Sequence, residues 1–521
     1  MNKNFGLICW LHKWRIPLLG LASVVVLFFL PDYLRLVEVL GRRIPQTDIR
    51  TDYLTGVGWA VFLGFTICVW PVPARDKKAL LRVWAVKCFV MLFLMLFYEY
   101  HYQVDSFGYF AQAGLEGVGW SAVYAGEARP NVPVTLVTLL HHYSHWLDSF
   151  HAIKISFGMI GLVGVYFFYR GASEFLNEDK IEVLYLLGLF PSILFWSSIL
   201  GKEPFVLFSI ALYSYGVMLW MKKQSLRSAL TLLTGLSCAA FVRPWLGYIL
   251  ALPVFIVTLI FFIKPDTRAK VIFLSVLVLI SCVFSETVMS TFSMKSFSDL
   301  PKVASQKYVG FARGGSTTVE RPKPEIVEKP VAAVTAESAV KPQGRDSAPP
   351  SVKPSAGSHA AASQRLPEAV NPAPPVAGEQ AAPAVEITES PAVIEPPPVP
   401  AAKPVQASKQ KYRGFTDMLF FIPKGMFTSL FRPLPGEVKN PFGILAGIEG
   451  GFLLVLFIFA LKGMRWRDIR DPVFVWALLL IVLWSGAYAF VSFNLGTVSR
   501  YRLQILPVFL GFLVYYARRK V

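Results

Sequence analysis

Long apolar runs, separated by short polar or basic segments, make up most of this chain. Many of the runs approach the ~20 residues that an α-helix needs to cross ~30 Å of hydrocarbon. Segments of about ten alternating apolar and polar residues, which would indicate strands of a membrane barrel, are not found in the sequence. The pattern therefore predicts an all-α polytopic membrane protein with about 12 transmembrane helices.

Basic residues set the predicted topology. Lys3, Lys13 and Arg15 precede the first run, and further Lys and Arg residues collect in every second loop, which places both termini in the cytoplasm. The first run is expected to be a retained span and not a cleaved signal peptide. The predicted spans cover 16–30, 53–72, 83–97, 153–169, 181–200, 205–221, 228–242, 245–263, 271–288, 442–461, 473–491 and 504–516.

Composition agrees with this interpretation. Of 521 residues, 54% are hydrophobic and only 16% are charged, and the mean hydropathy is +0.51. A net charge of +18 would suggest nucleic acid as the partner of a soluble protein, but here it follows the loops of one side, so no nucleic-acid partner is predicted. The five cysteines lie in or beside apolar runs and are expected to be small buried hydrophobes.

A segment rich in Pro and Ala divides the chain. Residues 314–411 contain almost no aromatic residues and include Pro-Pro runs, so they are predicted to be a disordered linker on the outer face. An N-terminal membrane module at 1–313 and a C-terminal membrane module at 412–521 are expected on either side. The linker is interpreted as an inert insertion or as a spacer that binds a partner.

Charged residues outside the basic loops converge on the predicted outer face. They are Glu99, Asp105, Lys202, Glu203, Arg243, Arg432, Glu437, Arg500 and Arg502. Ionisable groups at membrane depth are costly and tend to be paired or functional, and arginine binds phosphate with two hydrogen bonds. Simpler roles remain open: Asp105 as a helix cap, Lys202–Glu203 as a solvated pair, and Arg243 as a side chain that reaches the interface.

Histidines gather in the first outer loop, about 100–151. His141, His145 and Asp148 have the spacing of one helical face and are weak candidates for a metal site, in a helix expected at 134–150 to lie along the membrane interface. An interfacial helix without metal is the favoured interpretation. No cofactor is predicted with certainty, and a divalent cation is left open.

Three stretches give the chain a family resemblance. They are the acidic start of Asp105-Ser-Phe-Gly-Tyr-Phe-Ala-Gln-Ala113, the Pro-containing helix from Pro130 leading into the next span, and Phe190-Pro-Ser-Ile-Leu-Phe-Trp-Ser-Ser198 with Gly201-Lys-Glu-Pro204. With Arg243-Pro244 and the loop up to Arg502, the chain resembles the GT-C superfamily of membrane glycosyltransferases. The family's acids often stand as an adjacent pair after the first span, whereas here Asp105 follows the third and Glu99 is its nearest acid.

The resemblance implies a GT-C-like fold and a transfer reaction. The sugar would come from a polyprenyl-phosphate carrier and pass to a glycan, lipid or protein acceptor on the outer, periplasmic face of a bacterial inner membrane, in synthesis of the cell envelope or of exopolysaccharide. Asp105 would be the base, with Glu99 as the second acid. Lys202, Glu203, Arg243, Arg500 and Arg502 would bind the lipid phosphate.

Two other functions fit the same topology. A polysaccharide polymerase or ligase acting on lipid-linked oligosaccharide would also have many spans, large outer loops and essential arginines. A transporter or flippase would normally show internal repeats and polar sites at mid-membrane depth, and neither is clear in this sequence.

Overall fold

The computed structural model describes residues 29–102, 104–114, 132–262, 275, 415–438, 440–490 and 495–519. Within these ranges the chain is all helical and contains no strand. Three predicted segments lie outside the described residues: the span 16–30 except for its last two residues, the span 271–288 except for residue 275, and the linker 314–411.

Six helical segments are long and apolar enough to cross a membrane. They are α2 (Ile49–Val69), a continuous run Ala74–His101 made of α3 (Ala74–Phe89), the π-helical turn η1 (Val90–Leu94) and α4 (Met95–His101), then α8 (Phe150–Leu176), α11 (Lys202–Lys222), α13 (Pro244–Phe262) and α17 (Pro441–Gly463). Shorter apolar helices are α12 (Leu226–Val242), α18 (Pro472–Tyr488), α20 (Leu506–Arg518) and most of α16 (Phe415–Phe431). The described residues thus support a membrane protein with several spans.

The predicted span at 181–200 is wrong as a single helix. The structure divides it into α9 (Ile181–Leu189) and α10 (Pro191–Trp196), with Phe190 in an extended conformation between them. Pro191 lacks an amide hydrogen and disfavours helical geometry at the residue before it. The helix is therefore interrupted inside the apolar run.

The predicted interfacial helix at 134–150 is also interrupted. Helix α7 ends at Tyr143 (Val132–Tyr143), a single 3-10 turn η2 follows (His145–Leu147), and α8 begins at Phe150 with Ser149 as its N-cap. The Ser149 hydroxyl accepts the Ala152 amide, which satisfies one free donor of the new helix. The Ser149 cap thus starts a new helix, although the apolar periodicity continues through this segment.

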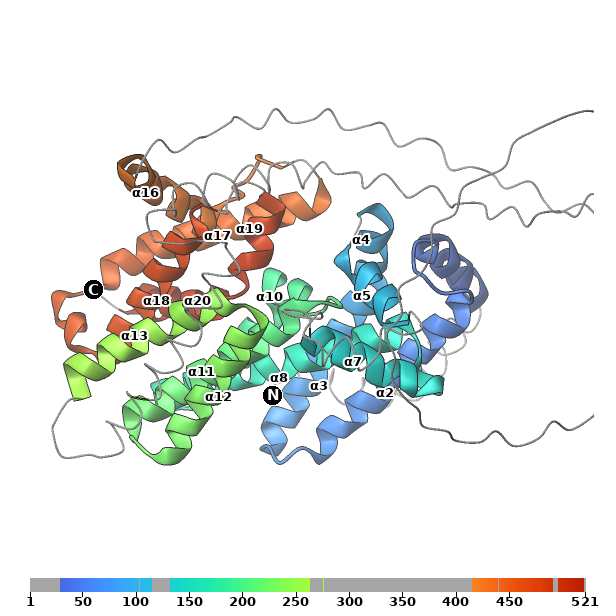
Figure 1. Cartoon of the computed structure of the whole chain (residues 1–521), viewed down its shortest axis with the longest axis horizontal. Coiled ribbons are helices and arrows are strands. Elements are labelled where there is room, and N and C mark those ends of the chain that lie inside the picture. The colour runs from blue at the N-terminus through green and yellow to red at the C-terminus, as the bar shows by residue number, and fades with distance from the viewer. Residues whose placement is uncertain are drawn as a thin grey trace, which may run out of the picture. The chain divides into compact units, whose positions relative to one another are not determined.

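Glycines bring the central helices together. α11 packs against both α8 and α12, and Figure 1 shows α11 and α12 side by side. A Cβ atom at Gly235 would lie 2.2 Å from the backbone nitrogen of Tyr213, and one at Gly216 would lie 2.4 Å from that of Leu232. Small residues let helix backbones approach closely inside a membrane, where burial in lipid gives no driving force for association.

Helices before and after the predicted linker are in direct contact. α13 and α11 pack against α18, and α10 packs against α17. Contacts place these helices in one compact unit. The described parts of the two predicted membrane modules therefore share an interior, and residues far apart in sequence can meet at one site.

Candidate functional site

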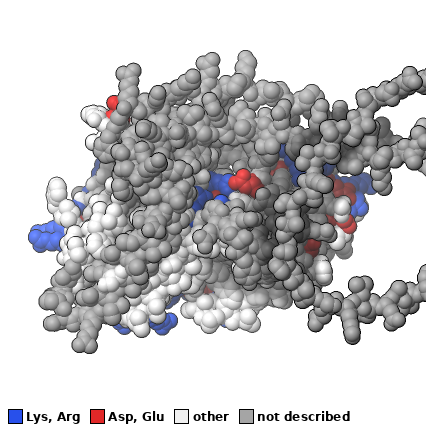
Figure 2. Space-filling view, viewed as in Figure 1, with Lys and Arg blue, Asp and Glu red and all other residues white. Residues whose placement is uncertain are grey.

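Four charged side chains from distant parts of the chain form a continuous cluster. The Arg500 guanidinium donates from Nη1 to Asp105 Oδ2 at 2.9 Å and from Nε to Glu203 Oε1 at 2.6 Å. Arg243 Nη2 reaches the same Glu203 oxygen at 3.2 Å. In the space-filling view, acidic and basic side chains lie next to one another near the middle of the face shown (Figure 2). We call Asp105, Glu203, Arg243 and Arg500 the charged cluster.

Asp105 reaches this position through the start of α5 (Asp105–Gly114). The neighbouring Ser106 hydroxyl donates to the Leu200 carbonyl at 2.8 Å, which ties α5 to the segment just before α11. The Asp105 side chain is 60% exposed, whereas that of Glu203 is only 4% exposed. The cluster thus runs from a buried acid to an exposed one through Arg500.

Glu203 lies in the first turn of α11, where the partial positive charge of the helix N-terminus favours a carboxylate. Its second oxygen, Oε2, is buried and has no hydrogen-bond partner among the described residues. A Cβ atom on Gly201 would come within 2.9 Å of that oxygen. In the Gly201-Lys-Glu-Pro204 sequence, Glu203 is therefore the acid, and the missing side chain of Gly201 leaves room for its carboxylate.

Arg243 links α12 to α13 and is held from two sides. Its guanidinium lies 4.6 Å from the centre of the Tyr501 ring, in addition to its contact with Glu203. Tyr501 follows Arg500 in α19 (Leu495–Arg502), a helix where the sequence predicted only a loop. Cation–π contacts of this kind are stronger where water is excluded. Arg243 thus contacts both Glu203 and the residue after Arg500, which stabilises the Glu203–Arg500 pair.

A cavity of about 600 Å³ opens beside the cluster, with Asp105 and Arg500 in its wall. One side is a group of aromatic rings, Tyr98, Tyr102, Phe195, Trp196 and Phe442. Tyr98 contacts the rings of Tyr102 and Phe442 at centroid distances of 4.8 and 5.0 Å. A concave site with an apolar wall and a few converging charges is the usual form of a small-molecule site.

The surroundings of Arg500 and Tyr109 favour the protonated form of both side chains. Burial opposes the charge of Arg500, but the Glu203 and Asp105 carboxylates outweigh it and raise the pKa of the guanidinium. Burial, with Asp105 and Glu203 nearby, raises the pKa of Tyr109 to about 12. Arg500 therefore stays a cation, and Tyr109 stays a phenol that can donate a hydrogen bond.

Arg502 belongs to a separate buried pair. Its side chain is 0% exposed, and Nη2 lies 3.2 Å from Glu449 Oε1 in α17. Nη1 donates to the Leu430 carbonyl at 3.0 Å, and the other Glu449 oxygen accepts the Ser192 amide at 2.8 Å. The contacts of this pair connect α10, α17, α19 and the end of α16. The structure thus places Arg502 in the interior and only Arg500 at the cavity wall with Asp105.

Sequence reasoning missed Glu449 and Ser192. An acid within the apolar run 442–461 was the available signal for Glu449, because an unpaired charge there would be costly. It also missed Lys87, whose buried Nζ donates to the hydroxyls of Ser197 and Ser198. Their partners come from other helices, so only packing identifies them.

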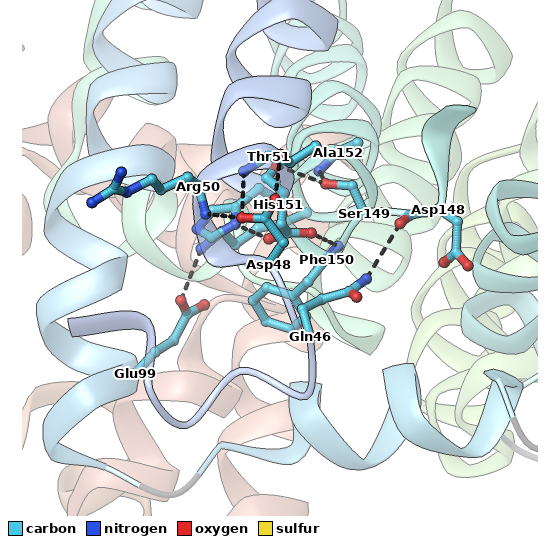
Figure 3. A network of polar contacts seen from close by, with 12 residues as sticks. Gln46, Asp48, Arg50, Thr51, Glu99, Asp148, Ser149, Phe150, His151 and Ala152 are labelled. Atoms are coloured by element: carbon cyan, nitrogen blue, oxygen red, sulfur yellow. Dashed lines mark hydrogen bonds and ion pairs between the residues drawn. The ribbon is translucent and has the colours of Figure 1, made fainter. Parts of the chain in front are cut away.

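Glu99 lies apart from the charged cluster. It is buried in α4 and accepts from Lys154 Nζ at 2.8 Å. In the same region, Asp52 of α2 contacts His151 Nδ1 and accepts the Phe150 amide at 2.6 Å. Figure 3 shows Glu99, Phe150 and His151 in this polar network. The structure therefore does not bring Glu99 together with Asp105. Instead, Glu99 and Asp52 pair with side chains of α8.

Lys202 lies near the charged cluster and is partly buried. Arg243, Glu203, Arg500 and Asp105 all influence it electrostatically, yet no ion pair of Lys202 is found within the described ranges. This position leaves a second cation next to Arg500.

The histidine candidates do not form a metal site in the part of the chain that the structure describes. His141 Nδ1 contacts the Leu147 carbonyl and Nε2 contacts the Ser156 hydroxyl, while Asp148 pairs with His142. His145 lies in η2, after α7 has ended, so the helical spacing is lost. Among the described residues, no group of three or more His, Cys, Asp or Glu side chains is close enough to hold a metal ion.

Comparisons with protein-family models, with curated proteins and with solved structures give no match for this chain.

Proposed function

We propose that this chain is an integral membrane glycosyltransferase that moves a sugar from a polyprenyl-phosphate carrier to an acceptor. The observation that carries the proposal is the exposed Asp105 carboxylate at a cavity wall, in contact with an arginine that a buried acid holds. A base and a phosphate-binding cation are the two groups that this transfer needs. The resemblance of the Asp105–Ala113 stretch to GT-C enzymes supports the same assignment.

In the proposed reaction, the donor phosphate draws Arg500 away from Asp105. Asp105 then accepts the proton of the acceptor hydroxyl as its oxygen attacks the anomeric carbon. The bond between that carbon and the phosphate oxygen breaks, and polyprenyl phosphate leaves with the negative charge. Arg500 and Lys202 stabilise this charge, while Glu203 and Arg243 keep Arg500 in position.

The rest of the proposal concerns the surroundings of the site. The aromatic wall of the cavity would face the sugar, and the bilayer would hold the polyprenyl chain. The reaction would take place at the periplasmic face of a bacterial inner membrane, with both chain termini in the cytoplasm. The acceptor would be a glycan, a lipid or a protein of the cell envelope.

Substitution of Asp105 tests the proposal. Membranes containing the full chain are incubated with polyprenyl-phosphate hexoses and pentoses that carry a radioactive sugar. We expect Asp105→Asn to lower transfer at least ~100-fold, the usual contribution of a general base. The control is Glu178→Gln, because Glu178 is an exposed acid that does not line the cavity.

Three outcomes would count against the proposal. Full transfer by well-expressed Asp105→Asn would remove Asp105 as the base. A ladder of products with many added units would indicate a polymerase or ligase. Movement of the lipid-linked sugar across vesicles without any transfer would indicate a flippase.

A further inference from the structure

A second cavity lies between helices at the other end of α11. It has a volume of about 270 Å³ and is lined by side chains of α8, α9, α11, α18 and α20. The wall is mainly apolar, with aromatic rings such as Phe175, Phe474 and Tyr515. The buried Ser214 hydroxyl also lines it and has no hydrogen-bond partner among the described residues. We call this space the apolar groove.

Two basic side chains, Lys180 and Arg518, line one end of the groove. The rings of Phe175 and Tyr515 are 5.0 Å apart, so the end of α8 and the end of α20 meet there. Among the residues that the structure describes, Lys180 forms an ion pair with the exposed acid Glu178, a type of pair that contributes little to stability. Arg518 shows no ion pair within the described ranges. Both cations are therefore available to an anion.

The length of the groove along α20 is similar to the thickness of the hydrocarbon layer of one membrane leaflet. It extends along α20 from Pro507 to Arg518, which is ~17 Å at ~1.5 Å per helical residue. Half of a hydrocarbon core of ~30 Å is similar in length. The basic end of the groove lies on the same side as the C-terminal end of α11. There Lys222 pairs with Glu174 of α8. Since α11 has 21 residues, its Lys222 end lies ~30 Å from Glu203 and the charged cluster.

We infer that the apolar groove binds one anionic phospholipid, with an acyl chain along α20 and the headgroup phosphate between Lys180 and Arg518. Basic pockets between transmembrane helices recognise anionic headgroups in this way. The apolar wall excludes a purely polar anion, and the two cations discriminate against a neutral lipid. This site is separate from the proposed donor site and does not depend on it.

Thermal unfolding of the full chain in neutral detergent tests the inference. Phosphatidylglycerol in large excess should raise the unfolding temperature by roughly 5 °C, because a ligand that binds only the folded state stabilises it. Phosphatidylcholine should have little effect. The double variant Lys180→Ala/Arg518→Ala should lose most of the shift, since it removes both headgroup contacts.

A variant that fills the groove gives a second measurement. Gly511 lines the groove, and a Cβ atom there would meet nothing within 4 Å, so Gly511→Leu should fold and abolish the lipid shift. Gly486→Leu is the matched control, because Gly486 also has free space and does not line the groove. Equal shifts with phosphatidylcholine, a shift only with a prenyl phosphate, or a full shift in the double variant would overturn the inference.

Discussion

Arg500 and Arg502, two residues apart, have different environments. Arg500 is 23% exposed and faces the cavity, whereas Arg502 is fully buried against Glu449 and two backbone carbonyls. Sequence reasoning placed both on the outer face because they share one short segment between apolar runs. It could not separate their roles, because the turn of α19 decides which side chain points inward.

This contrast predicts opposite effects of two substitutions. Arg502→Met should lower the free energy of unfolding by ~3–5 kcal/mol, because it leaves the buried Glu449 carboxylate without its cation. Adding Glu449→Met should restore much of the loss, because the interior then holds no unpaired charge. Denaturant unfolding in detergent measures both variants.

Arg500→Met should show the reverse pattern. Glu203 keeps Arg243 as a partner, so the loss of stability should be smaller, while sugar transfer should fall ~100-fold or more. A large loss of stability with normal transfer in Arg500→Met would contradict the assignment of Arg500 to the phosphate.

At the scale of elements, the extent of several apolar helices could be predicted, and helix breaks could not. The apolar runs at 205–221 and 245–263 correspond closely to α11 and α13. The run at 181–200 is also apolar, but its helix is interrupted before Pro191. Helix α10 then carries Ser192, whose amide donates to Glu449. Length and hydropathy do not distinguish an unbroken span from an interrupted one, and Pro191 was the available signal for the break.

The contact between α11 and α12 gives a prediction at this scale. Gly235→Leu should destabilise the protein by ~3 kcal/mol, because the new side chain overlaps the Tyr213 backbone of the facing helix. Gly58→Leu is the control, since a Cβ atom at Gly58 meets nothing within 4 Å. Thermal unfolding of both variants should show a clear loss only for Gly235→Leu, and equal losses would contradict the close approach of the two helices.

At the scale of the whole molecule, the site depends on both sides of the predicted linker. Asp105, Glu203 and Arg243 precede that segment, and Arg500 follows it. Charge patterning predicted that these residues share a face, because alternating basic loops fix the direction of each span. Which pairs form could not be predicted, because pairing depends on contacts such as those of α13 with α18.

A split chain tests this dependence. Residues 1–360 and 361–521, expressed as two polypeptides in one cell, should purify as a complex, because α10, α11 and α13 pack against helices of the second piece. The second piece alone should be degraded, since it would expose Arg500 and Glu449 without their partners in α10 and α11. Stable expression of the second piece alone would contradict a shared interior.

The double contact of Glu203 also has a consequence for the time course of synthesis. Arg500 lies 297 residues after Glu203, so it emerges about 15–60 s later at ~5–20 residues per second. Arg243 lies only 40 residues after Glu203 and emerges within seconds. Arg243 can therefore neutralise the acid while the membrane protein is still being made. The arginine that serves the proposed reaction is then the last member of the cluster to arrive.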